Sequence, residues 1–337
     1  MGVLAEPDTE PEQTNVLDVR DLHVWIDVRR DRALHVVRGL NFTLAPGQRF
    51  GLVGESGCGK TTALLAMLGL LPPSASASGQ VILKGTDIFA RGEQSVAPAR
   101  WTDIAIVFQG AMNALNPVKT VGWQIAEPMV RHGVARRQAA WRRAEHLLNL
   151  VGIPSAAARR YPHEFSGGMR QRAAIAMALA CEPQVLLADE PTTALDVMVQ
   201  AQILELLVRL TDELGLALVL VTHDLPVVAQ VCDQAAVMYA GEFVEKGPVD
   251  SLYHDPRHPY TRMLFAATPD LHRRDSVRSI PGSPPRLDRE ITGCPFRPRC
   301  DQALDRCAVE PPLLLALDDS RAAACLVDHD RSQPAAS

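Results

Sequence analysis

Short apolar runs alternate with longer amphipathic stretches along most of this chain. The runs at residues 50–53, 185–188 and 217–221 consist almost entirely of apolar residues. Such runs are typical of strands buried on both faces of a parallel sheet, whereas a half-solvated strand alternates apolar and polar residues. Between them, residues 62–71 and 198–214 carry apolar side chains at helical spacing. The pattern therefore predicts parallel strands joined by helical crossovers.

The middle of the chain is predicted to be mostly helical. Within residues 109–180, apolar side chains recur at helical spacing between 141 and 151, and a second helix is expected from Ser166 to about residue 180. Residues 181–245 then return to strand–helix alternation, with further strands at 235–239 and 243–245 and a short helix after Pro226. No internal repeat is visible, so one α/β unit is expected.

The two ends of the chain differ from this unit in composition. Residues 1–16 are acidic, contain two prolines and lack the basic start of a signal peptide, so they are predicted to form a disordered tail. The proline-rich C-terminal part allows only short, broken regular structure. We therefore expect an α/β domain at 17–250, with a helical subdomain at about 109–180, and an irregular domain at 251–337.

Length and charge limit the possible functions. The 337 residues suffice for one large domain and a smaller one. A net charge of −5, with both signs mixed along the chain, gives no basic surface for nucleic acid. No apolar run approaches the roughly eighteen residues needed to cross a bilayer, so the chain itself is not expected to span a membrane.

Residues 54–61, GESGCGKT, match the phosphate-binding pattern GxxxxGK[ST], known as Walker A. A predicted strand precedes the match and a predicted helix follows it, which an ordinary glycine-rich turn would not require. Glycines let the backbone wrap around an anion, Lys60 supplies positive charge, and Thr61 offers a hydroxyl to Mg²⁺. A nucleoside triphosphate is therefore expected here. The expected binding residues are Gly54, Ser56, Gly57, Cys58, Gly59, Lys60, Thr61 and Thr62.

A pair of carboxylates ends the predicted strand at 185–188. Asp189 and Glu190 would lie beside the phosphate loop, because the carboxyl ends of parallel strands meet at one edge of the sheet. Asp189 is predicted to hold Mg²⁺, and Glu190 to accept a proton from the attacking water. Taken alone, the pair could equally be a solvated strand end.

A second anion-binding segment precedes these carboxylates. Ser166, Gly167, Gly168 and Met169 open a predicted helix, with Ser166 as its N-cap and the two glycines exposing backbone donors.

In this order, the motifs resemble those of the ATP-binding subunit of an ABC transporter, a P-loop NTPase. The resemblance covers about residues 17–250 and includes LLADEP, the ALD of 194–196 and the VTHD of 221–224. It implies a mainly parallel sheet with a small antiparallel part and an inserted helical subdomain. It also implies that Gln109 touches Mg²⁺ with Thr61 and Asp189, and that His223 contacts the γ-phosphate. Residues 194–196 would line a dimer seam, and the segment Met112–Pro117 would lie near the membrane subunit.

The chain departs from the family pattern in two places. The signature LSGGQ is here FSGGM, with Phe165 and Met169 replacing its first and last residues. The donors are backbone groups and Ser166, so function should survive. The aromatic residue that usually stacks on adenine falls at Ile26, while the adjacent Trp25 would point to the opposite face of its strand. Which residue stacks on adenine is left open.

The C-terminal part carries four of the seven cysteines, spaced C-x5-C-x6-C-x17-C. The strings HPYT at 258–261, IPGSPP at 280–285 and GCPFRPRC at 293–300 resemble the C-terminal extension of dipeptide and oligopeptide importer ATPases. Some members of that family carry an iron–sulfur cluster here. Four thiolates suit a 4Fe–4S cluster or tetrahedral Zn²⁺, and free structural cysteines are the alternative. The candidate ligands are Cys294, Cys300, Cys307 and Cys325.

The resemblance thus implies an ATPase that powers import of di- or oligopeptides. Its expected partners are a second, identical or homologous ATPase subunit closing head to tail, two transmembrane permease subunits and an extracytoplasmic substrate-binding protein. Its expected place is the cytoplasmic face of the inner membrane, as a peripheral subunit. Import of a nickel complex or glutathione is an alternative. A non-membrane ABC ATPase is disfavoured, because tandem domains or a long coiled-coil insertion are missing, and intact Glu190 and His223 argue against an inactive scaffold.

Overall fold

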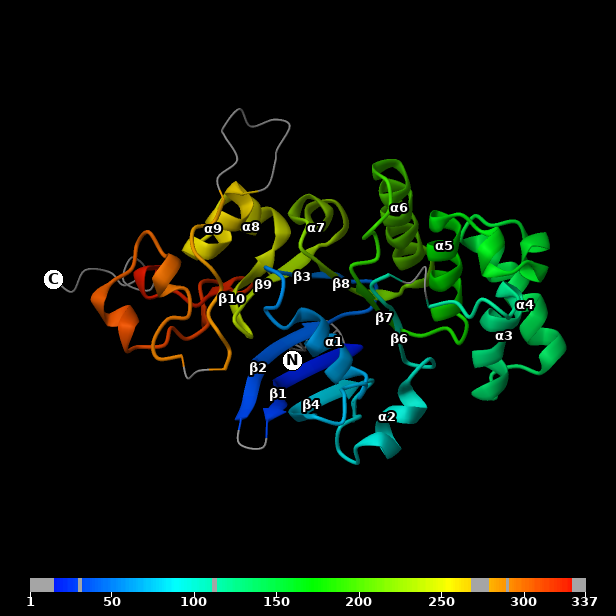
Figure 1. Cartoon of the computed structure of the whole chain (residues 1–337), viewed down its shortest axis with the longest axis horizontal. Coiled ribbons are helices and arrows are strands. Elements are labelled where there is room, and N and C mark those ends of the chain that lie inside the picture. The colour runs from blue at the N-terminus through cyan, green and yellow to red at the C-terminus, as the bar shows by residue number, and fades with distance from the viewer. Residues whose placement is uncertain (1–14, 30–31, 111–113, 268–278, 289–290, 329–337) are drawn as a thin grey trace, which may run out of the picture.

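A mixed eight-stranded sheet forms the centre of the computed structural model, which describes residues 15–29, 32–110, 114–267, 279–288 and 291–328 (Figure 1). Five neighbouring strands, β9, β3, β8, β7 and β6, run parallel to one another. At the other edge of the sheet, β10, β12 and β11 pair antiparallel with their neighbours. In sheet order the strands are β11 (Leu315–Ala316), β12 (Ala322–Ala323), β10 (Glu242–Pro248), β9 (Gln234–Tyr239), β3 (Arg49–Val53), β8 (Ala217–Thr222), β7 (Val185–Asp189) and β6 (Ile104–Val107).

Several sequence expectations fall partly on residues outside these ranges. Residues 1–14 of the expected disordered tail are not described, and neither are Met112 and Asn113 of the expected membrane-subunit contact. The same holds for residues 268–278, 289–290 and 329–337 of the expected C-terminal domain.

The strands β7 and β8 are buried on both faces, as their continuous apolar runs predict. Alternate residues along each strand point to opposite faces, so the two strands divide their side chains between two apolar clusters. One cluster contains Leu186, Ala188, Leu218 and Leu220, and the other contains Val185, Leu187, Val219 and Val221.

A second, antiparallel sheet covers one face of the central sheet, with helix α1 (Lys60–Met67) between them (Figure 1). Leu64 and Met67 of α1 are fully buried in a cluster shared by both sheets. The strands, in sheet order, are β2 (Arg32–Leu44), β1 (Leu17–Arg29), β4 (Ala75–Leu83) and β5 (Thr86–Asp87). This layer holds the start of α1, and with it the phosphate-binding motif, against the central sheet.

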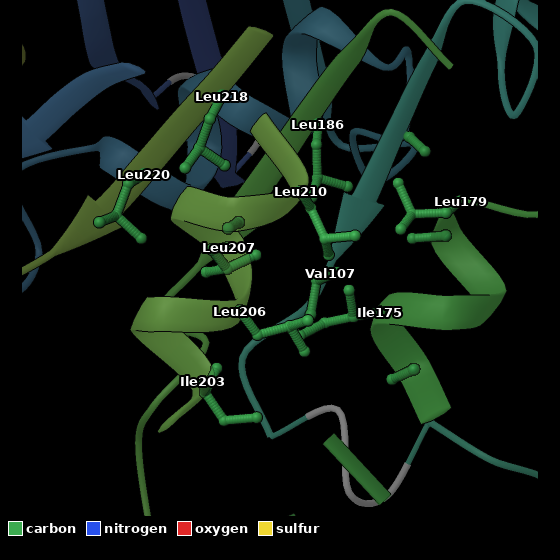
Figure 2. Packing of buried hydrophobic residues seen from close by; sticks show 14 of the residues in the cluster. Val107, Ile175, Leu179, Leu186, Ile203, Leu206, Leu207, Leu210, Leu218 and Leu220 are labelled. Atoms are coloured by element: carbon green, nitrogen blue, oxygen red, sulfur yellow. The ribbon is translucent and has the colours of Figure 1, made fainter. Parts of the chain in front are cut away.

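Helices α6 (Val197–Leu214) and α7 (Leu225–Val231) cover the opposite face. Figure 2 shows Leu207 and Leu210 of α6 on the side of Leu186 and Leu218 of the sheet, and all four belong to one buried cluster. Asp196 caps α6 by accepting a hydrogen bond from the N–H of Val199, and Gly215, at φ 63, ends it.

A helical part extends the molecule beyond β6 (Figure 1). Helices α3 and α4 pack on each other and on α5, whose buried face joins the cluster seen in Figure 2. Its elements are α3 (Val121–Arg131), α4 (Arg137–Leu150), the 3-10 turns η2 (Ser155–Arg159) and η3 (Pro162–Glu164), and α5 (Gly167–Ala178); α2 (Glu93–Ala99) precedes β6.

The C-terminal part returns to the opposite edge of the central sheet. Strand β12 pairs with β10, with Glu245 opposite Ala323, so the last described residues extend the sheet itself. The remaining elements are α8 (Val249–His254), α9 (Pro259–Ala266), η4 (Arg297–Arg299) and η5 (Asp305–Ala308). All are short, as the prolines predict.

The predicted fold class, α/β with a mainly parallel sheet and a smaller antiparallel part, is confirmed. The helix expected at 62–71 begins and ends earlier, because Gly69 adopts φ 60 and its N–H bonds back to the carbonyl of Ala66. Among the described residues, no helix is both long and apolar enough to cross a bilayer.

Candidate nucleotide-binding site

Residues 54–59 form the loop that joins β3 to α1. Gly59 adopts φ 109, and a Cβ placed there would lie 2.7 Å from the carbonyl oxygen of Val36 in β2. At Gly54, a Cβ would lie 2.3 Å from the carbonyl oxygen of Met238 in β9. Both positions need glycine, because the loop packs directly against the backbone of two strands.

The Lys60 side chain is buried within this loop. Its Nζ donates hydrogen bonds to the carbonyl oxygens of Gly54, at 2.7 Å, and Glu55, at 3.0 Å. Burial raises the pKa of the adjacent Cys58 thiol, so Cys58 adds no negative charge. Ser56, Gly57 and Thr61 are exposed. The arrangement places a positive charge inside a loop of backbone groups, as an anion-binding loop requires.

Thr61 and Asp189 lie next to each other, as the pattern predicts. Thr61 Oγ1 donates to Asp189 Oδ1 at 3.1 Å, joining the start of α1 to the end of β7. Asp189 is 1% exposed, and burial raises the pKa of its carboxyl although Thr61 opposes the shift. A hydroxyl and a carboxylate oxygen are ligands that suit Mg²⁺, so these two residues fit that ion.

Glu190 is held by three side chains from three separate segments. Its Oε2 accepts from Gln109 Nε2 at 2.7 Å and from Thr193 Oγ1 at 2.9 Å, and its Oε1 lies 2.9 Å from Nδ1 of His223. Glu190 also adopts φ 43, a left-handed conformation that is uncommon outside glycine. Such a conformation persists only where the surroundings fix it.

The environment keeps Glu190 ionised. Burial alone would raise the pKa of its carboxyl, but hydrogen bonds from His223 and Thr193 and the charge of Lys60 outweigh burial and lower it. A carboxylate that stays ionised at neutral pH can accept a proton from water.

The segment 166–169 opens α5, away from the phosphate loop. Ser166 is the N-cap of α5, as expected, and its Oγ accepts from the N–H of Met169 at 3.3 Å. A Cβ on Gly168 would lie 2.6 Å from Val199 of α6, so α5 and α6 approach closely there. Figure 1 shows α5 beyond α6, while α1 lies below the middle of the sheet. Of the residues expected at the nucleotide site, this segment therefore lies apart from the phosphate loop and the carboxylates.

Trp25 belongs to a stack of rings on the antiparallel sheet. Its ring lies 4.6 Å from that of His35 and 5.4 Å from that of His23, measured between centroids. Ile26 instead packs against the apolar cluster between the two sheets. The two neighbours thus face opposite ways, as the strand period predicts.

Thr193 and Arg299 contact the site but were not predicted from the sequence to belong to it. Thr193, two residues beyond the DEP motif, bonds to Glu190. Arg299, from the C-terminal part, forms an ion pair with Glu55 of the phosphate loop. Position next to a motif could have suggested Thr193, but no local pattern pairs residues that lie 244 positions apart.

The four C-terminal cysteines lie in one region and form no disulfide. The pKa of Cys294 is raised to about 11, mainly by burial and in part by the nearby Cys307 and Cys300. The N–H of Cys294 donates to the carbonyl oxygen of Cys307 at 2.9 Å. Within the described ranges, however, no three His, Cys, Asp or Glu side chains converge closely enough to hold a metal ion, so the expected cysteine site is not confirmed.

Two family models match this chain. The model described as "ABC transporter" matches residues 37–193, which contain the phosphate loop and the carboxylates. The model described as "Oligopeptide/dipeptide transporter, C-terminal region" matches residues 244–307.

Curated relatives match over almost their whole length. The "Probable peptide ABC transporter ATP-binding protein y4tR" of Sinorhizobium fredii is 46% identical, covering 94% of this chain and 96% of its own. The "Dipeptide transport ATP-binding protein DppD" of Bacillus subtilis is 42% identical, covering 95% and 97%.

Among solved structures, the dimer of the ATP-binding cassette MJ0796 in a post-hydrolysis state, bound to ADP and Pi, is similar with a TM-score of 0.61 and 27% identity. The match covers 69% of this chain and 98% of that one. CbiO1 of Clostridium perfringens, part of an ABC transporter complex, is similar with a TM-score of 0.61 and 29% identity. That match covers 72% of this chain and 92% of CbiO1.

Proposed function

This chain belongs to the ATP-binding subunits of ABC transporters of the peptide importer type, and from this we propose that it hydrolyses ATP to power the uptake of di- or oligopeptides. The observation that carries the proposal is the meeting of Lys60, Thr61, Asp189 and Glu190 at one edge of the sheet. The C-terminal family match supports peptides as the cargo, and a nickel complex or glutathione is the alternative.

Each residue of the site has a distinct task in this proposal. Lys60 and the N–H groups of the loop bind the phosphates, together with Thr62 at the start of α1. Thr61, Asp189 and Gln109 would hold Mg²⁺, which neutralises the charge of the phosphates when bound. Their hydroxyl, carboxylate and amide oxygens fit that ion.

Glu190 is proposed as the general base for the attacking water. Its lowered pKa, its fixed conformation and its three partners support this role. His223 is proposed to orient Glu190 and to reach the γ-phosphate. Gln109 would respond to both the metal site and the membrane subunits, because it contacts Glu190 directly and precedes the expected membrane-facing segment.

The separation of α5 from α1 supports a head-to-tail pair. In that pair, residues 166–169 of one subunit would complete the ATP site of the other, with residues 194–196 at the seam. The second ATPase is either a copy of this chain or a homologue. Two transmembrane permease subunits and an extracytoplasmic binding protein would complete the importer, with this chain at the cytoplasmic face of the inner membrane.

A metal in the C-terminal part is a further element of the proposal. Cys294, Cys300, Cys307 and Cys325 would hold a 4Fe–4S cluster or, alternatively, Zn²⁺. The absence of disulfides and the mutual electrostatic effects of these thiols support their grouping. Because their side chains do not converge as a metal site requires, no step of hydrolysis is assigned to them.

Peptide uptake by the assembled importer tests the function. In proteoliposomes that contain the permease subunits and the binding protein, ATP should drive accumulation of a labelled dipeptide or oligopeptide. Lys60→Ala should lower uptake strongly at limiting ATP, because a lost charged hydrogen bond weakens nucleotide binding by about 1.5–3 kcal/mol. ATP-driven uptake of a nickel complex or glutathione, but of no peptide, would contradict the assignment of cargo.

A further inference from the structure

An ion pair connects the C-terminal part to the phosphate loop. Arg299 donates from Nη1 to Glu55 Oε2 at 2.6 Å and from Nη2 to Glu55 Oε1 at 2.9 Å. The Arg299 side chain is 3% exposed and that of Glu55 is 25% exposed. This is a two-point arrangement between a planar guanidinium and a carboxylate, which fixes both direction and distance.

Arg299 is itself held from several sides. Its Nε donates to the carbonyl oxygen of Pro281 at 2.8 Å, and Nη1 also reaches Tyr239 Oη at 3.3 Å. Its guanidinium lies 5.9 Å from the centre of the Phe296 ring. These contacts set the rotamer of Arg299 independently of Glu55, so the arginine can act as a fixed support.

The backbone of Glu55 is held by the same part of the chain. Its N–H donates to the hydroxyl of Tyr260, a fully buried residue of α9, at 2.9 Å. Its carbonyl oxygen accepts from Lys60 Nζ. The carboxylate, N–H and carbonyl of this loop residue are therefore all engaged, the first two by residues that follow β10 in the chain.

We propose that Arg299 is a positioning residue of the ATP site, which fixes the phosphate loop through Glu55 and neutralises a carboxylate that would otherwise repel the phosphates of the nucleotide. The inference rests on the proposed ATPase function. It assigns the C-terminal part a role in nucleotide affinity, in addition to any role in assembly.

The electrostatic half of the proposal follows from the position of Glu55. A carboxylate inside a loop that binds a triphosphate opposes binding, and the effect is strong where solvent screening is incomplete. The guanidinium of Arg299 cancels this charge at contact distance. Removing Arg299 should thus leave the loop less fixed and more negative, whereas removing both charges should leave it only less fixed.

The test uses the full-length subunit and a fluorescent ATP analogue. Arg299→Gln should raise the Kd about tenfold, the loss expected for one charged hydrogen-bonded pair. In the double variant Glu55→Gln with Arg299→Gln, the Kd should fall back to within about threefold of the wild type, because the unpaired carboxylate is gone. Arg299→Lys keeps the positive charge but cannot donate to both carboxylate oxygens of Glu55 as the planar guanidinium does. It should raise the Kd about threefold.

A structural role alone predicts a different result. Arg257 is a matched control, because it pairs with the buried Asp328 at 2.9 Å in the same C-terminal part without touching the loop. Arg257→Gln should lower the thermal unfolding midpoint and leave the Kd unchanged.

Three outcomes would overturn the proposal: a Kd for Arg299→Gln within twofold of the wild type, a double variant that binds no better than Arg299→Gln, or an equal increase in Kd for Arg257→Gln. If Arg299→Gln does not fold, a wild-type Kd for Arg299→Lys overturns it instead. Failure of the ATPase function is distinguishable, because a wild type that binds ATP without turnover leaves these Kd comparisons unchanged. If the loop binds no nucleotide, the wild type and Lys60→Ala would bind the analogue equally weakly.

Discussion

Glu190 combines an unfavourable backbone conformation with a complete set of partners. The left-handed conformation costs of order 1–3 kcal/mol, and it persists because Gln109, Thr193 and His223 hold the carboxylate. The conformation turns the side chain to where its partners meet, at the end of β7. Strain at this residue is thus tied to a defined orientation of the proposed base.

Glu190→Gln tests the role of Glu190 as general base, because it replaces one carboxylate oxygen by an amide nitrogen. The amide keeps the size of the side chain but cannot take a proton, so turnover should fall about 10²-fold or more while ATP still binds. Turnover is measured as ATPase activity, and ATP binding as nucleotide affinity, on the transporter assembled with its membrane subunits.

Glu205→Gln provides the matched control, because Glu205 is exposed on α6 and lies outside the site. It should leave turnover unchanged. Near-normal turnover in Glu190→Gln would remove Glu190 from the mechanism.

Single residues in ordered motifs were predictable, and their distant partners were not. Thr61 and Asp189 meet as predicted, because the motif spacing and the parallel sheet together place them at the same edge. Arg299 and Glu55 meet because the C-terminal part returns to the phosphate loop, and no local periodicity contains that information. The convergence expected for the four cysteines was inferred from thiol chemistry and from the resemblance of the C-terminal part to importer ATPases, and it is not confirmed.

At the level of elements, buried strands were the most predictable feature. The run 217–221 became β8, Ala217–Thr222, because a continuous apolar run needs burial on both faces. Helix ends were less predictable, since they depend on caps such as Gly69 and on the loop that precedes Lys60. The pairing of β12 with β10 had no sequence signal, because β12 has only the two residues Ala322 and Ala323.

The start of α9 predicts a pH-dependent stability. His258 is the N-cap of this helix, and its Nδ1 accepts from the N–H of Tyr260 at 3.0 Å. Burial, and to a lesser degree the charge of Arg262, lowers the pKa of His258 to about 3. Between this value and about 6.5, the unfolded state binds a proton that the folded state does not. Stability should therefore fall as pH decreases through this range, by up to about 1.4 kcal/mol per pH unit.

His258→Asn keeps a side-chain acceptor for Tyr260 and removes the titrating group. The variant should be less stable near neutral pH, because the ring contact with Phe296 is lost. Its stability should nevertheless depend less on pH below about 6.5. Urea unfolding at several pH values measures the slope, and His254→Asn on the exposed face of α8 is the control. An unchanged slope in His258→Asn would assign the pH dependence to other groups.

At the scale of the whole molecule, the C-terminal part and the nucleotide site form one connected structure. The C-terminal part pairs with the sheet through β12 and reaches the phosphate loop through Arg299 and Tyr260. Cys294 and Cys300 flank the segment that carries Arg299. A metal or a packing contact that fixes these cysteines would therefore also help to fix Arg299, and through it the phosphate loop.

The metal proposal is tested by purification without oxygen and without chelator. A 4Fe–4S cluster would make the protein brown, zinc would leave it colourless with stoichiometric metal, and free thiols would titrate. Serine at Cys294, Cys300, Cys307 or Cys325 should each remove the metal, while serine at Cys58, Cys181 or Cys232 should not. Iron and zinc contents near zero would exclude the metal and leave the ATPase function intact.

Because α5 lies away from α1, we expect each ATP site to form between two subunits. If Ser166 of one subunit acts on ATP bound by the other, then neither Ser166→Arg nor Lys60→Ala alone has an intact composite site in a pair of identical subunits. Mixing the two variants should restore part of the activity, because the mixed pair contains one site with both wild-type halves. Ser166→Arg mixed with the double variant Lys60→Ala, Ser166→Arg is the control, since that pair contains no intact site.

Activity should also rise with subunit concentration, because the sites form on association. If the partner is a homologue, the two changes belong on the two different chains. Full activity of a monomer at high dilution, or a mixture no more active than its components in the correct pairing, would refute the head-to-tail arrangement.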